Sequence, residues 1–103
     1  MKLLTLIVHT NVQEKLTEQL RSMEQITGFT FSHAEGHGTE PETDNYLSAH
    51  DAVIGLAPNL RVDILLEDAN IDSVLTELRS SDSNVSGQGI YWVSPVEQGG
   101  HLL

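Results

Sequence analysis

The feature that most constrains this chain is a strand–helix–strand pattern that occurs twice. Residues 2–10 form an apolar run rich in Leu, Ile and Val, which predicts a buried strand. An apolar stripe with helical spacings of four, four and three follows, and residues 29–37 begin with Phe and polar residues in alternation, as a strand would. The stripe consists of Val12, Leu16, Leu20 and Met23.

The second half of the chain repeats this pattern. Residues 60–67 and 90–96 are strand-like apolar runs, and the helix predicted between them has apolar residues at i, i+3, i+4 and i+7. The residues of this second stripe are Ile71, Val74, Leu75 and Leu78.

Both helices have candidate capping residues. Asn11 precedes the first stripe, and Glu14 three residues later completes a capping-box pattern. Asp68 or Asn70 is placed to cap the second helix in the same way.

The order of elements predicts an α+β fold. We expect residues 1–103 to form one ferredoxin-like βαββαβ domain, an antiparallel four-stranded sheet with two helices on one face. Residues 36–59 lack strong periodicity and are expected to form a long loop, with a short helical turn near residues 46–52. Residues 98–103 are expected to be a flexible tail.

The first strand is apolar on both faces. Leu3 and Ile7 alternate with Leu4, Leu6 and Val8, yet only one of these sets can face the helices. The other set is either a group of ordinary surface hydrophobes or a face buried against other subunits, and we favour the second interpretation.

Charge excludes several classes of partner. The chain has 15 acidic and 5 basic residues, a net charge of −10, which disfavours binding to nucleic acid and to anionic membrane surfaces.

The initial apolar run is too short to be a signal peptide or to insert into a membrane, so we expect a cytoplasmic protein. No Cys is present, and no nucleophile elbow, phosphate loop or Ser-His-Asp pattern indicates an enzyme.

The candidate metal ligands are His33, Glu35, His37 and His50. The first three alternate along one strand and therefore share a face, and His50 lies in the acidic loop that follows. Imidazole and carboxylate together suit divalent transition metals such as Zn, Ni, Cu or Co. The other interpretation is that these are exposed residues without a ligand. The acidic loop is likewise either a solvated surface or a docking site for a basic partner.

Three stretches carry a family resemblance: TGFTFSHAEGHG, RVDILLEDANIDSVLTEL and SGQGIYWVSPVEQ. In this order and spacing they resemble the PII-like proteins, the superfamily of nitrogen-regulatory PII and CutA. The resemblance implies a homotrimer whose sheets face inward, with effector sites between subunits. It also implies long loops that touch a partner protein, such as a membrane transporter.

The nucleotide-binding residues of PII are not matched. Gly87 and Gly89 are similar to the glycines of the PII nucleotide-cleft turn, but Ile90 stands where nucleotide-binding members have Lys. No Lys or Arg lies within residues 36–59 or 80–89, so binding of ATP or ADP at this cleft is doubtful. We therefore expect a PII-like regulator that binds a small effector, with a divalent transition metal cation as the candidate, and modulates a partner such as a cation transporter. The alternative is an effector-free module that docks its acidic loop on a basic protein.

Overall fold

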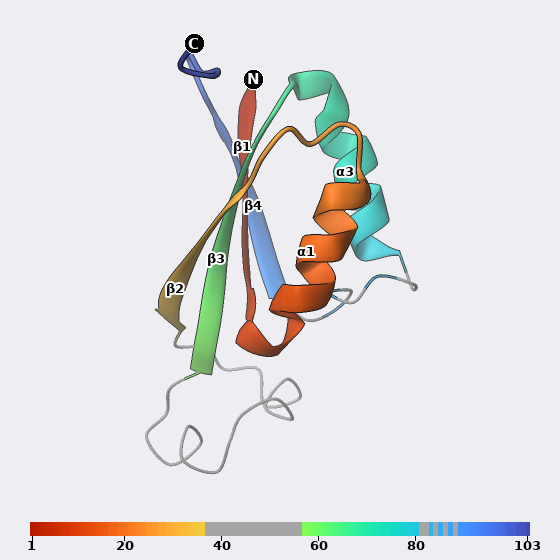
Figure 1. The fold of residues 1–103 in the computed structure, drawn as a ribbon, viewed down its shortest axis with the longest axis vertical. Coiled ribbons are helices and arrows are strands. Elements are labelled where there is room, and N and C mark those ends of the chain that lie inside the picture. The colour runs from red at the N-terminus through yellow and green to blue at the C-terminus, as the bar shows by residue number, and fades with distance from the viewer. Residues whose placement is uncertain (37–56, 81–82, 84, 86, 88) are drawn as a thin grey trace.

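The computed structural model describes residues 1–36, 57–80, 83, 85, 87 and 89–103. Within these residues the helices and strands follow the predicted order (Figure 1). The elements are β1 (Lys2–His9), the 3₁₀ turn η1 (Thr10–Val12), α1 (Gln13–Ser22), β2 (Thr30–Gly36), β3 (Ala57–Leu66), the 3₁₀ turn η3 (Asp68–Asn70), α3 (Ile71–Arg79) and β4 (Gly89–Pro95).

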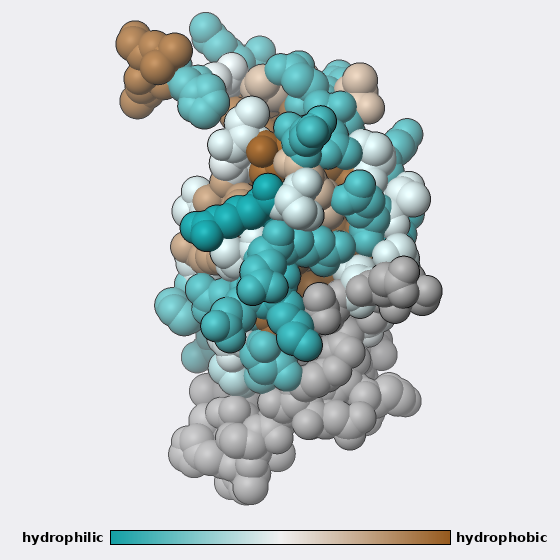
Figure 2. Space-filling view, turned by 45° about the vertical axis from the view of Figure 1, so that its right-hand side comes forward, coloured by the Kyte–Doolittle hydropathy of each residue, from teal (hydrophilic) through white to brown (hydrophobic). Residues whose placement is uncertain are grey.

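The four strands form one antiparallel sheet in the order β2-β3-β1-β4. Both α1 and α3 lie on the same face of this sheet (Figure 1), and their outer surface is mostly hydrophilic (Figure 2). The prediction of an α+β, ferredoxin-like architecture is confirmed. No helix in the described part of the chain is long and apolar enough to cross a membrane.

Alternate residues of β1 form the base of the core. Leu4 and Leu6 lie opposite Ile64 and Val62 of β3, on the face that the helices cover. The predicted stripes of both helices pack onto this layer, with Ile71 only partly buried at its edge. The buried apolar residues are Leu4, Leu6, Val8, Val12, Leu16, Leu20, Met23, Leu60, Val62, Ile64, Leu66, Val74, Leu75 and Leu78. Complete burial of one such side chain contributes roughly 1.5–3 kcal/mol.

The predicted cap of the first helix is wrong. Asn11 lies inside η1, and α1 begins after Val12, whose side chain makes no capping hydrogen bond. The capping acceptor of η1 is instead His9, whose Nδ1 accepts a hydrogen bond from the Asn11 backbone N–H at 3.0 Å. Because this 3₁₀ turn lies between β1 and α1, Asn11 lies inside the turn and is at the N-cap position of neither η1 nor α1.

The second helix begins at Ile71, the first residue of the predicted stripe, with Asn70 at its N-cap position. Asp68 and Asn70 lie in η3, and neither caps α3 through its side chain. The carboxylate of Asp68 accepts a hydrogen bond from the Met1 amino group at 2.6 Å, which lowers the pKa of that carboxyl. This contact joins the start of β1 to the turn that follows β3.

The structure extends β3 toward the predicted loop. The strand starts at Ala57, so Pro58 pairs with Glu35 of β2. Proline lacks a backbone N–H, and Pro58 lies in the part of β3 beyond its pairing with β1, which ends at Asn59. The helical turn predicted near residues 46–52 lies outside the described residues. Residues 98–103 form no helix or strand, and Leu102 and Leu103 are fully exposed.

The turn into β4 requires both of its glycines. Gly87 has a φ of 73°, in the left-handed region that disfavours other residues. A Cβ on Gly89 would lie 2.5 Å from the backbone carbonyl oxygen of Ile7 and 2.9 Å from Cγ1 of Val8. The absence of a side chain at Gly89 therefore allows β4 to approach β1.

We predict that Gly89→Ala lowers the free energy of unfolding by about 1–3 kcal/mol, because the new methyl group would push β4 away from β1. Urea denaturation measures this loss. Gly28→Ala is the matched control, since a Cβ at Gly28 meets nothing within 4 Å. Equal effects of the two substitutions would contradict the close approach at Gly89.

Candidate functional site

Two of the four predicted metal ligands lie on β2. His33 and Glu35 pair with Leu60 and Pro58 of β3, and both are exposed. Because Leu60 belongs to the core, the two side chains lie on the helix-bearing face of the sheet, along its β2 edge. The shared face predicted from the alternation is therefore present for this pair.

The other two predicted ligands, His37 and His50, lie outside the described residues. Within the described part of the chain, no group of three or more His, Cys, Asp or Glu side chains is placed to hold a metal ion. The described part of β2 therefore supplies two donors, and the four-ligand site stays a prediction.

In the turn that resembles the PII nucleotide cleft, the fold itself explains why residues 87 and 89 are glycine. The φ of Gly87 and the space at Gly89 are explained by the turn and by β1 alone. The next residue, Ile90, is apolar and 63% exposed. The turn therefore needs no bound phosphate to account for its residues.

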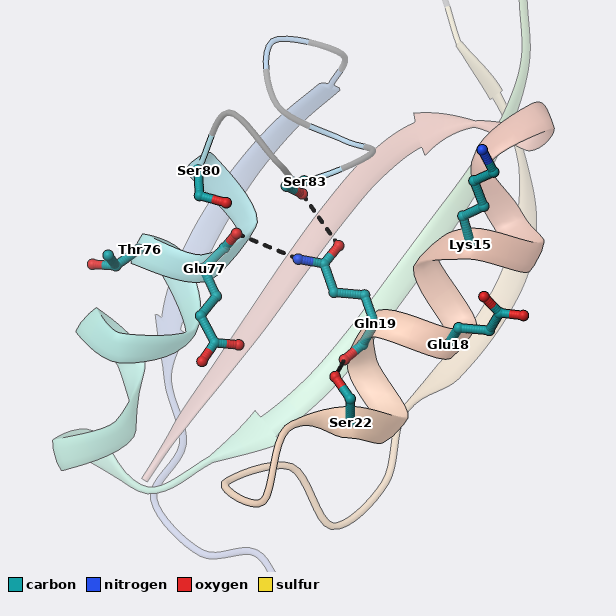
Figure 3. Close-up of a pocket in the computed structure, with 8 residues that line it drawn as sticks. All are labelled: Lys15, Glu18, Gln19, Ser22, Thr76, Glu77, Ser80 and Ser83. Carbon is teal, nitrogen blue, oxygen red and sulfur yellow. Dashed lines mark hydrogen bonds between the residues drawn. The ribbon is translucent and has the colours of Figure 1, made fainter.

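A polar cleft of about 540 Å³ separates α1 from α3 (Figure 3). Gln19 crosses it: Nε2 donates to the backbone oxygen of Glu77 at 3.3 Å, and Oε1 accepts from the Ser83 hydroxyl at 3.1 Å. Both ends of the amide are occupied by the protein, so Gln19 ties residue 83 and the end of α3 to α1. The remaining lining residues are Lys15, Glu18, Ser22, Thr76 and Ser80. Ligand pockets are lined mostly by hydrophobic and aromatic side chains, whereas every residue that lines this cleft is polar or charged.

The sheet face opposite the helices, which we call the open face, carries a polar cluster near its centre. The Thr5 hydroxyl donates to Oδ1 of Asp63 at 2.8 Å, and Nε of Arg61 donates to Oδ2 of Asp63 at 3.0 Å. The guanidinium carbon of Arg61 lies 5.7 Å from the centroid of the Trp92 ring. Thr5 is 0% exposed although no helix covers this face, because it pairs directly with Asp63 on one side and Trp92 on the other.

Apolar side chains surround this cluster. Ile90 lies opposite Ile7, and Leu3 lies opposite Leu65, all on the open face. Trp92 is 40% exposed on the edge strand β4, so a large part of its ring faces solvent in a single chain. These apolar residues are the basis for interpreting the open face as an interaction surface.

The open face is also poor in acidic groups. Register places only one carboxylate on it among the described strand residues, Asp63, and Arg61 neutralises that charge. The chain as a whole has a net charge of −10. The other carboxylate of the described strands, that of Glu35, lies on the helix-bearing face.

Sequence reasoning missed Arg61, Asp63 and Thr5 as candidate functional residues. A signal was present, because Arg61 and Asp63 alternate with the core residues Val62 and Ile64 and must point away from them. The position of Trp92 could not be read in this way. It depends on β4 pairing with β1, which lies between β4 and β3.

The comparisons with known proteins agree on one family. No curated protein matches the chain. A crystal structure of a DUF3240 family protein from Shewanella baltica OS155 is similar, with a TM-score of 0.73 and 21% identity over 99% of this chain and 96% of that one. The family model described as "Protein of unknown function (DUF3240)" matches residues 1–103. The chain therefore belongs to the DUF3240 family.

Proposed function

We propose that this protein is a non-catalytic, cytoplasmic regulator of the PII-like type. It assembles as a homotrimer, binds a small effector and modulates a partner protein such as a cation transporter. The ferredoxin-like fold is compatible with this function, and the resemblance of three sequence stretches to PII-like proteins points to it.

One observation carries the proposal: α1 and α3 cover one face of the sheet and leave the other open. On that open face Ile90 and Trp92 are 63% and 40% exposed, and Ile7 is only half-buried. Covering such side chains removes apolar surface from water, which favours association by roughly 25 cal/mol per Å². The low charge of the face allows copies of a strongly acidic chain to approach one another there.

We expect the protein to elute as a trimer, at three times its 11.3 kDa chain mass, in size-exclusion chromatography with light scattering. Ile90→Glu adds a carboxylate to the open face and should shift the population to monomer. Leu102→Glu is the control, because Leu102 is fully exposed and lies outside the sheet. A wild-type protein that stays monomeric at micromolar concentration would rule out the assembly.

The effector we propose is a divalent transition metal cation. His33 and Glu35, exposed on one face of β2, supply an imidazole and a carboxylate, and His37 and His50 are the further ligands proposed from the sequence. A ligating imidazole must be deprotonated, so affinity should decrease as the pH is lowered.

Calorimetric titration of Zn, Ni, Cu and Co into the wild type tests this site. His33→Ala combined with His37→Ala should reduce affinity by at least the roughly 10–100-fold that the loss of a residue supporting a ligand costs. His101→Ala, a histidine outside the sheet, should bind like the wild type. Equal binding by all three proteins would remove β2 from the metal site. Partner binding that is unchanged by a chelator but sensitive to salt would favour the effector-free interaction module.

A further inference from the structure

Arg61 has hydrogen-bonding capacity that the single chain does not use. Its Nε donates to Asp63, and the face of its guanidinium lies over Trp92. Its two terminal amino groups have no hydrogen-bond acceptor among the described residues, and the side chain is 42% exposed. In a single chain, water can accept hydrogen bonds from these N–H groups.

Covering the open face would remove that water. Buried N–H groups of a cation without acceptors are costly, and breaking a buried ion pair is more so. A neighbouring copy that covers Arg61 must therefore bring acceptors to it. Asp63 is the one carboxylate that the described strands place on this face.

Asp63 also has capacity left. Its Oδ1 accepts from Thr5 and, at 3.3 Å, from Nε of Arg61, while among the described residues its Oδ2 accepts only from that Nε. An ionised carboxylate offers about four acceptor positions. The Oδ2 oxygen can accept a further bond from another copy.

We propose that Arg61 and Asp63 select how copies of this chain pack on one another. In the assembly, the terminal amino groups of Arg61 bind the Asp63 carboxylate of a neighbouring copy. This inference rests on the proposed homotrimer. An apolar face alone permits many packings, whereas a cation and an anion at a single place on it permit few, which is the best-attested role of a buried ion pair. Trp92 and the contact within the chain hold the guanidinium in place before association.

Two single variants and their mixture test the proposal. Arg61→Met and Asp63→Asn each remove one half of the pair, and each alone should weaken self-association at least about tenfold. In an equimolar mixture, the Arg61 of one variant can meet the Asp63 of the other, although neither chain has an intact pair of its own. Partial recovery of assembly in the mixture is the expected result, because a mixed trimer restores one of its three Arg61–Asp63 pairs. Analytical ultracentrifugation over a concentration series measures it.

Arg79→Met is the matched control. Arg79 also lies over an aromatic ring, with its guanidinium carbon 4.7 Å from the Tyr91 centroid, but Tyr91 lies opposite the core residue Leu6 and so on the helix-bearing face. This variant should assemble like the wild type. Circular dichroism checks that Arg61→Met and Asp63→Asn are folded. If either is not, Arg61→Gln and Asp63→Ser replace them in the same mixing test.

The outcomes separate the two proposals. A monomeric wild type overturns the homotrimer and this inference with it. A trimeric wild type overturns this inference alone if the folded single variants assemble equally well. A trimeric wild type also overturns this inference if the single variants assemble more weakly and their mixture shows no recovery of assembly. The pair would then act only within one chain.

Discussion

The structure depends on the two-sided pairing of β1. This strand lies between β3 and β4, and its alternation assigns every residue of the sheet to one face or the other. Leu4, Leu6 and Val8 point to the helices and are buried. Leu3, Thr5 and Ile7 point to the open face, so an apolar strand in the middle of a one-sided sheet leaves apolar surface uncovered.

The proposed function rests on this uncovered apolar surface. A chain with a net charge of −10 repels copies of itself, yet the described strands place a single carboxylate on the open face, and it is paired with Arg61. Charge and hydropathy therefore favour the same face for association. The polar cluster of Thr5, Asp63, Arg61 and Trp92 adds a fixed point beside the apolar side chains of this face.

Sequence reasoning worked where periodicity is strong. Both helical stripes and all four strands were predicted, because burial of one face leaves a repeat in the chain. The predicted cap at Asn11 was wrong, and Asn70 is the N-cap residue of α3 but makes no capping hydrogen bond through its side chain. A 3₁₀ turn precedes each helix, and no periodic pattern reports such a turn. His33 and Glu35 were correctly placed on one face by their spacing, whereas the remaining ligands fall outside the described residues.

The sequence by itself determined the order of elements and the identity of the core. These follow from local conformation and from the alternation of apolar side chains. Only the tertiary structure decided which apolar face of β1 stays open, and that Arg61 meets Trp92 from two strands away. These contacts join residues far apart in the chain, and they depend on strand order and register, which no local pattern records.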